Sequence, residues 1–461
     1  MAGYQPMNRP YHLLVTAAGL VFFTSSFDLF LNINLGPNIR IAQLFVLVLL
    51  AAALLTHRLG RTMEIPLGGL YLIAWCAVQL AFVPVAEFWQ KSLAYCLWLA
   101  LDIALSFALV NLFAGDSRNL PTLLKLYLAS FAFISAFGIV QFISPILGGP
   151  ALLVEQWWLP GRVPRVNGFS YEPSYYATYL IMGLVCLGSL RRSGMVEYLS
   201  RQWTFAYLLI FLALLICFSR MGVVFALVEV SIAPLTRLWK IVKHPGLVLG
   251  FRLSGWKMLA LAVVLLAAYS SVTRAVAWFL DDPETVEILV SGTGLLGTAS
   301  HSVDEREDHL HGTLLTIAHH PWMGQSLGGI TESIAGYNGL RPQHFEETKI
   351  FEGQSVFAEV AAASGIPGSI PFLCFLAVTI VAPLRLAARS SPRYAAWLRA
   401  LVLALIFEWA ILQLNQNILR LYLWVHIALL ATVYSAARRQ YILSGDAEPG
   451  DAGYDSPNLL A

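Results

Sequence analysis

The chain contains 461 residues, of which 58% are hydrophobic and only 12% are charged. Soluble domains are about one-quarter charged, so this composition indicates a protein embedded in a membrane. The formal net charge of +2 is too small for a basic surface that binds nucleic acid, and this class of partner is excluded. The five cysteines lie in apolar runs without the spacing of metal ligands, so we expect them to be small buried side chains.

Apolar runs recur along most of the chain at the length of about 20 residues that crosses a bilayer core. The pattern predicts an all-α, polytopic integral membrane protein with about twelve transmembrane helices. The first run is longer than the apolar part of a signal peptide and lacks a cleavage site, so we expect a retained helix. The expected spans are 12–32, 40–57, 65–86, 92–114, 121–143, 173–190, 203–218, 221–236, 257–277, 367–386, 397–415 and 420–437.

The distribution of basic residues predicts the orientation of these spans. Most of the 29 Lys and Arg residues fall in loops on the same side as the two chain ends, and positively charged loops face the cytoplasm. Four regions follow from this reading. They are helices one to nine in 1–277, a large periplasmic loop in 278–366, helices ten to twelve in 367–437, and a disordered cytoplasmic tail in 438–461.

The large loop is expected to be partly helical. Its segment DHLHGTLLTIAHHPWMG has a helical apolar pattern, and we expect this face to pack on the membrane domain. The face consists of Leu310, Leu314, Ile317 and Ala318. The two halves of the chain show no repeat, which disfavours a transporter built from two similar bundles.

A first group of candidate site residues precedes the sixth span, in GRVPRVNGFSYEPSYYATYL. Arg162 and Arg165 lie on the side where the positive-inside rule disfavours basic residues. Glu172 stands at a helix start, where it stabilises the helix dipole or acts as a base. Tyr175 and its neighbouring tyrosines either anchor the helix in the headgroups or contact substrate.

A second candidate, Arg220, interrupts an apolar helical hairpin in CFSRMG. An arginine costs about 2.5–3.5 kcal/mol at the bilayer centre, so it needs a partner. It either extends to the headgroups or binds a phosphate or diphosphate, because the planar guanidinium forms two parallel hydrogen bonds to phosphate oxygens.

The third group lies in DEREDHLHGTLLTIAHHPWMGQSLGG of the large loop. Arg306 is surrounded by acidic residues, so a surface ion-pair cluster is the simpler interpretation. The histidines have neither HExxH nor another metal-site spacing, and we expect no metal site. These histidines are His309, His311, His319 and His320.

These motifs together resemble the superfamily of O-antigen ligases and polymerases, which are bacterial envelope glycosyltransferases. In that superfamily a periplasmic loop carries an arginine that opens a helix, followed by a Pro-x-x-Gly turn and a glycine-rich stretch. Arg306, Pro321, Gly324 and Gly328 match this order and spacing.

Two further segments carry the resemblance. A Ser-Arg-Gly break in an apolar hairpin is matched by Ser219 and Arg220, with Met221 interposed before Gly222. The segment GFSYEPS, which begins at Gly168, is similar to one that many polymerases carry before their middle span.

One departure from the ligase pattern affects the predicted reaction. In ligases the loop ends in a His-Asn pair, and the histidine is regarded as catalytic. Here Gln354 and Ser355 stand at that place. Glutamine cannot serve as a base at neutral pH, so we favour a polymerase over a ligase.

The resemblance implies a glycosyltransferase of the bacterial inner membrane whose active site faces the periplasm. The donor would be an undecaprenyl-diphosphate-linked oligosaccharide, and the partners a glycan acceptor, membrane lipids and a chain-length regulator. We expect no cofactor and no metal. The expected catalytic residues are Arg220, Arg306 and Glu172, and the expected substrate-binding residues are Arg165, Arg162, His319, His320 and Tyr175, with Glu352 and His344 as weaker candidates for a base.

Three alternatives remain at this point. An O-antigen ligase would transfer the glycan to lipid A core. A transporter or lipid flippase would have ionisable residues at mid-membrane, for which only Asp102 and Glu408 qualify. A polymerase of peptidoglycan would share the general architecture but use lipid II as its donor.

Overall fold

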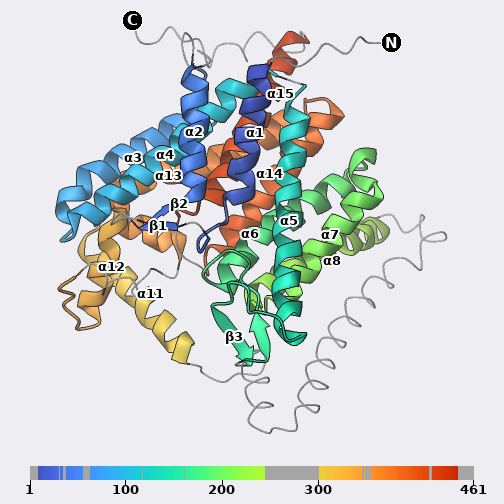
Figure 1. Cartoon of the computed structure of the whole chain (residues 1–461). Helices are drawn as coiled ribbons and strands as arrows, with labels where there is room; N and C mark the ends of the chain where they lie inside the picture. The colour runs from blue at the N-terminus through green and yellow to red at the C-terminus, as the bar shows by residue number, and fades with distance from the viewer. Residues whose placement is uncertain are drawn as a thin grey trace, which may run out of the picture.

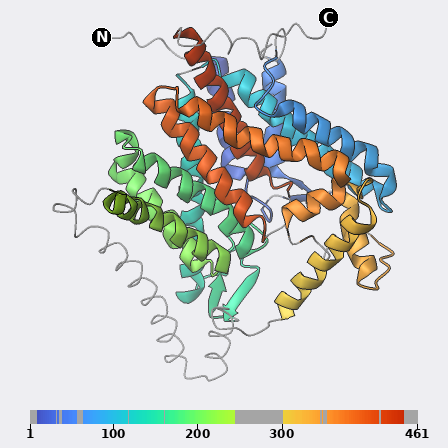
Figure 2. The same cartoon turned by 180° about the vertical axis from the view of Figure 1, so that it is seen from behind.

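The structure is a computed structural model that describes residues 9–30, 32–34, 38–55, 63–116, 118–159, 161–243, 301–344, 347, 353, 355–414 and 418–444. It is a bundle of helices seen from two sides in Figures 1 and 2. The helices are α1 (Arg9–Thr24), α2 (Ile41–Leu55), α3 (Gly69–Phe82), α4 (Trp89–Phe113), α5 (Leu120–Ile146), α6 (Pro173–Arg192), α7 (Arg201–Ile216), α8 (Arg220–Lys243), α11 (His301–His319), α12 (Ser326–Tyr337), α13 (Val356–Ala387), α14 (Pro392–Ile411) and α15 (Leu421–Leu443), with short 3₁₀ turns η1 (Val83–Val85) and η2 (Val196–Leu199).

Within the described part of the chain, five helices are long and apolar enough to cross a membrane, namely α4, α5, α13, α14 and α15. Shorter apolar helices accompany them, and the chain is a mostly helical protein with multiple membrane spans. Each expected span overlaps a described helix except 257–277, which lies outside the described residues. The count of twelve crossings and the four-region division stay predictions. Helix α13 begins at Val356, inside the expected loop, and α15 continues to Leu443.

The centre of the bundle is formed by α6 and α15. Helix α14 packs along α6, and α15 packs along α4. Nearly every side chain of α6 and α15 is buried, so these two helices face protein rather than lipid. Helix α1 starts and α15 ends at the top of Figure 1, which we call the terminal face. Strands and loop helices α11 and α12 lie toward the opposite end, which we call the loop face.

The first expected span, 12–32, is too long. Helix α1 ends at Thr24, because the Thr24 and Ser25 hydroxyls donate to carbonyl oxygens of the last turn. The chain then forms an antiparallel pair of short strands, β1 (Asn32–Asn34) and β2 (Asn38–Arg40). The sequence pattern did not predict these strands.

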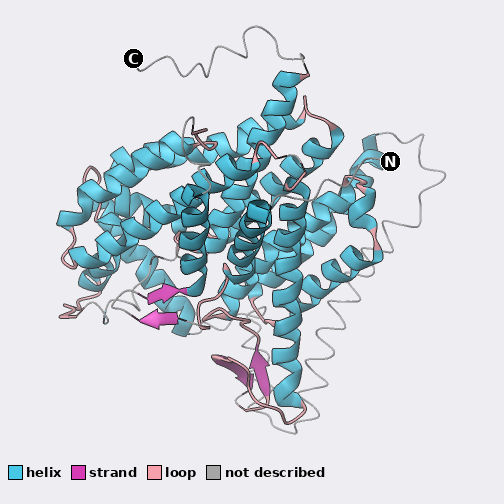
Figure 3. Cartoon of the chain, turned by 45° about the horizontal axis from the view of Figure 1, so that its top comes forward, coloured by secondary structure: helices cyan, strands magenta, loops and turns pink. Residues whose placement is uncertain are grey.

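A second antiparallel pair also departs from the expected all-α fold. Strand β3 (Gln156–Leu159) pairs with β4 (Val163–Arg165) between α5 and α6. Both pairs are visible in magenta in Figure 3. Runs of three or four residues are too short to show a period of two in the sequence.

The prediction of which face of the loop helix packs against the protein is wrong. Helix α11 packs against α12 and α13 through Gly312, Thr313 and Thr316, all of which are buried. The two threonine hydroxyls donate to the carbonyls of His309 (2.8 Å) and Gly312 (2.9 Å), so each can be buried with its polar group satisfied. The prediction assumed that the apolar residues of this helix would be the buried ones. Instead, Leu310, Leu314 and Ala318 are exposed, and Ile317 is partly buried.

The Pro-x-x-Gly turn after α11 packs on a kink in α13. Gly365 has a left-handed φ of 54° at this kink. The Ile366 N–H donates to the Pro321 carbonyl at 2.8 Å, and the Gln325 N–H donates to the Ala362 carbonyl at 3.0 Å. A Cβ on Gly324 would overlap the Ala363 carbonyl, so this position of the motif requires glycine.

The glycine-rich start of α12 packs on the backbone of α4. A Cβ on Gly328 would lie 2.5 Å from the Ser92 nitrogen. Further along α12, the Glu332 carboxylate accepts N–H bonds from Glu87 (2.9 Å) and Phe88 (3.2 Å). Burial raises the pKa of the Glu332 carboxyl above its ordinary value, and these N–H donors and Lys91 act in the opposite direction. The loop is thus fixed to the membrane domain by close backbone contact and a buried carboxylate.

We predict that Gly328→Ala destabilises this contact by about 1–3 kcal/mol, because the added methyl group has backbone on its far side and must displace α12. Gly336→Ala is the matched control, since nothing lies within 4 Å of a Cβ on this glycine of the same helix. The midpoint of thermal unfolding in detergent measures the difference. Equal midpoints for the two variants would contradict the close packing of α12 on α4.

Candidate functional site

The candidate site begins at the turn that precedes α6, which a buried polar network holds. The Gln141 side chain of α5 accepts N–H bonds from Asn167 (3.1 Å) and Gly168 (2.9 Å). The Asn167 amide donates to the carbonyls of Leu153 (3.0 Å) and Ser170 (2.5 Å). Gly168 has a φ of 58°, and a Cβ there would lie 2.6 Å from the Tyr176 ring. The GFS segment therefore has one fixed conformation.

Glu172 is the N-cap residue of α6, as expected from its place before Pro173. Its backbone is extended, which the following proline favours, and Pro173 occupies the first helical position. The Glu172 carboxylate accepts a hydrogen bond from the Ser174 hydroxyl at 2.9 Å and stays partly exposed. A carboxylate in this position is accessible to a substrate hydroxyl.

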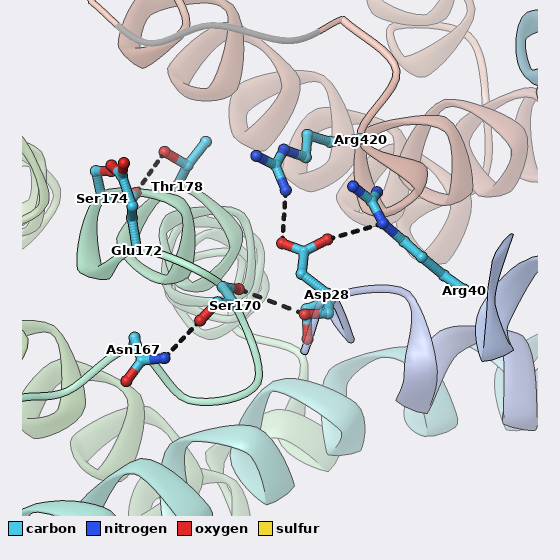
Figure 4. Close-up of polar contacts among 9 residues, drawn as sticks. Asp28, Arg40, Asn167, Ser170, Glu172, Ser174, Thr178 and Arg420 are labelled. Atoms are coloured by element: carbon cyan, nitrogen blue, oxygen red, sulfur yellow. Dashed lines mark hydrogen bonds and ion pairs between the residues drawn. The ribbon is translucent and has the colours of Figure 1, made fainter. Parts of the chain in front are cut away.

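Three charged residues that the sequence analysis did not select meet beside this helix start, as Figure 4 shows. The Asp28 carboxylate lies 3.1 Å from Nε of Arg40 and 2.5 Å from Nη1 of Arg420. Asp28 and Arg420 are buried, and Arg40 is mostly buried. The guanidinium of Arg420 also lies over the Tyr175 ring, 3.7 Å from its centroid.

Phe169 joins the turn before α6 to this charge cluster. The Phe169 carbonyl accepts N–H bonds from Asp28 (2.9 Å) and Leu29 (3.0 Å). Its ring stacks on Phe27 and on Phe137, with centroids 4.1 and 4.0 Å apart. The end of α1, the turn before α6 and the start of α15 are therefore fixed to one another.

The β3–β4 pair carries two basic residues. Arg165 is hydrogen-bonded within the pair, and Arg162 is exposed. Arg165 Nη1 donates to Gln156 Oε1 at 2.8 Å across the two strands. Arg162 is exposed in the turn between the strands. The pair lies at the loop face, beside the start of α6.

Arg220 is the first residue of α8 and is exposed. Its hairpin turn contacts the β3–β4 pair, because the Phe218 and Trp158 rings lie 4.1 Å apart. Helix α8 also approaches α6 closely, since a Cβ on Gly222 would lie 2.6 Å from that of Ala177. The structure thus brings the segment of Arg220 to the segment of Arg165 and Glu172. Among the described carboxylates, none forms an ion pair with Arg220.

The histidines of the large loop lie elsewhere. His319 Nδ1 is 2.6 Å from the Tyr337 hydroxyl, where α11 meets α12, and His320 is exposed at the same corner. Figures 1 and 2 both show this corner apart from the β3–β4 pair and from α7 and α8. His344 is exposed. The side chain of Arg306 and the residues Glu352 and Gln354 lie outside the described part of the chain.

The sequence contains a signal for two of the three residues in the Asp28 charge cluster, although the predicted site did not include them. In the topology expected from the sequence, Arg40 and Arg420 stand at span ends on the same side as Arg162 and Arg165, where the positive-inside rule disfavours them. Applying that criterion to every span end selects both arginines, although it does not select Asp28. Among the described residues, no group of three His, Cys, Asp or Glu side chains has the arrangement of a metal site. The assembled groups are arginines and carboxylates, which suit an anionic substrate with a hydroxyl.

Comparison with known proteins identifies part of the chain. Residues 205–373 match a family model described as O-antigen ligase. This segment runs from α7 past the kink of α13, so it contains Arg220, Arg306 and the Pro-x-x-Gly turn, whereas Asp28, Glu172 and Arg420 lie outside it. A comparison with curated proteins finds no match. Residues 205–373 are therefore a domain of the O-antigen ligase family, whose members are membrane enzymes that transfer glycans in the synthesis of lipopolysaccharide and related polysaccharides.

Proposed function

We propose that the protein polymerises oligosaccharide repeat units that are linked to undecaprenyl diphosphate, at the periplasmic face of the bacterial inner membrane. The observation that carries this proposal is the cluster of arginines and carboxylates around the start of α6. It joins Arg420, Arg40 and Asp28 to the neighbourhood of Glu172. Without Glu172, the two guanidinium groups and the Asp28 carboxylate carry a net positive charge, which favours a diphosphate.

The proposed reaction is a displacement at the anomeric carbon of the donor sugar. The oxygen of an acceptor hydroxyl forms the new bond to that carbon, and the bond between the carbon and the diphosphate oxygen breaks. The electron pair leaves with undecaprenyl diphosphate, and the hydroxyl proton passes to a carboxylate, for which we propose Glu172. Because negative charge develops on the leaving group, fixed arginines lower the barrier without a metal ion.

The residues have three roles in this proposal, which are contact with the diphosphate, positioning of the arginines and contact with the glycan. Arg220 and Arg306 contact the diphosphate, and Arg165, with Arg162 at the rim, supports its binding. Asp28 is a positioning residue, because it fixes Arg420 and Arg40 rather than contacting the sugar. Tyr175 limits the orientation of the Arg420 guanidinium by stacking against it. The exposed His319 and His320 would contact the glycan away from the reacting bond.

The ligase reaction is the second candidate, and the family description favours it. We favour the polymerase because Gln354 and Ser355 stand where ligases carry His-Asn. Ser355 is the N-cap of α13, accepts the Ala358 N–H at 3.5 Å and contacts Gln413 at 3.3 Å. A serine in these contacts has a structural role at the helix start.

The first prediction of this proposal concerns the substrate. Purified protein in detergent, given only an undecaprenyl-diphosphate-linked repeat unit and EDTA, is expected to make lipid-linked chains of two or more units and release undecaprenyl diphosphate. Gel or mass analysis of the glycan measures chain length. Transfer only to added lipid A core would favour the ligase, consumption of lipid II would favour peptidoglycan synthesis, and activity only after a metal is restored would contradict the metal-free mechanism.

The second prediction concerns the arginines. We expect Arg220→Lys and Arg306→Lys to slow chain extension about 100- to 1,000-fold, nearly as much as Ala, because lysine keeps the charge but loses the two parallel hydrogen bonds. Arg201→Lys is the control, since Arg201 is exposed at the start of α7. Membrane levels of each variant are compared first. Near-normal extension by both variants would show that these arginines only anchor the helices.

The third prediction concerns orientation. Gly336→Cys places a thiol in open space on α12, whereas Gly339 has a φ of 76° and would be strained by substitution. Val196→Cys is the comparison variant for the opposite side of the membrane. It lies at η2, between α6 and α7, which the expected topology places in the cytoplasm. A membrane-impermeant thiol reagent is expected to label only Gly336→Cys in intact cells with a permeable outer membrane. The native cysteines are buried or partly buried, so background is low. Labelling of Val196→Cys alone would invert the topology.

A further inference from the structure

A cavity lies at the terminal face, at the end of the bundle opposite the candidate site. It has a volume of about 560 Å³ and is formed by the end of α4, the start of α14 and the end of α15. Its polar lining consists of Arg393, Arg439, Ser391 and Gln440, and Trp397 forms part of its wall. The proposed glycan transfer does not use any of these residues.

The two arginines of the cavity are held in different ways. The Arg393 guanidinium lies 4.8 Å from the centroid of the Trp397 ring and is exposed. Arg439 contacts Glu64 through Nε at 3.1 Å and also through Nη2. A Cβ on Gly115 would lie 2.8 Å from Nη1 of Arg439, so this glycine leaves room for the guanidinium. Two guanidinium groups and one carboxylate give the cavity a net positive charge.

We propose that this cavity binds the headgroup phosphate of an anionic phospholipid. The cavity lies where apolar helices α4, α14 and α15 end, which is the level of the lipid headgroups. Trp397 and Tyr394 in its lining are the residue types that concentrate at this level. Basic pockets between transmembrane helices bind anionic headgroups by this chemistry.

The start of α14 adds to the attraction. Its first N–H groups have no partner within the helix, and its N-cap residue Ser391 does not cap them through its side chain. The positive end of the helix dipole therefore adds to the two arginines. A soluble phosphate would use the same contacts, but only a lipid also covers the apolar helix ends with its acyl chains.

Binding of phosphatidylglycerol to the purified full chain tests the proposal, with phosphatidylcholine of the same acyl chains and inorganic phosphate as the other probes. Native mass spectrometry measures the bound lipid and its apparent affinity. We expect phosphatidylglycerol to bind in preference to phosphatidylcholine. Arg393→Gln is expected to weaken phosphatidylglycerol binding about fivefold, since one arginine near the surface contributes to this extent.

The matched control is Arg399→Gln, because Arg399 is exposed on the same helix but does not line the cavity. It is expected to bind phosphatidylglycerol as the native chain does. Equal binding of the two lipids, or an equal loss in Arg399→Gln and Arg393→Gln, would overturn the proposal. Displacement of the lipid by millimolar inorganic phosphate would show that the cavity takes a soluble anion instead. The unfolding midpoint without lipid shows whether Arg393→Gln is folded.

Discussion

The Asp28 carboxylate fixes the loop-face end of the helix bundle. It pairs with Arg40 at the start of α2 and Arg420 at the start of α15, and its own N–H is bonded to the turn before α6. Apolar side chains give helices in lipid little preference for one neighbour over another, so directional contacts of this kind set their relative positions. Loss of one partner of a buried pair costs about 3–5 kcal/mol, because the remaining charge is left buried and uncompensated.

This arrangement also determines what the candidate site can bind. A single arginine in the bundle would need a carboxylate of its own, and the pair would then be neutral. Here one carboxylate serves two guanidinium groups, so positive charge remains beside Glu172 at the start of α6. Tyr175 stabilises that charge through its ring face without neutralising it. In the proposed function, this charge attracts the diphosphate while the arginines stay in fixed positions.

The sequence predicted the helical fold well, because a bilayer allows few structures other than apolar helices of fixed length. It failed where polar groups decided the result. Thr24 and Ser25 end α1 early, and Thr313 and Thr316 are buried in α11 while Leu314 is exposed. Glu172 could be selected because a helix start is a local pattern. Asp28 and Arg420 could not be paired from sequence, since 392 residues separate them and only the folded bundle brings them together.

Helix α15 connects the two charged regions of the molecule. Arg420 precedes its first residue and Arg439 lies in its last turns, so the arginines stand about 30 Å apart along one helix. Between them nearly every side chain is buried, and 89% of the apolar window of α15 lies inside the protein. A helix buried in this way has little lipid contact to hold it at a given depth. Its position is therefore set by packing against α4 and α14, with the buried Asp28–Arg420 ion pair at one end and the more exposed Glu64–Arg439 pair at the other.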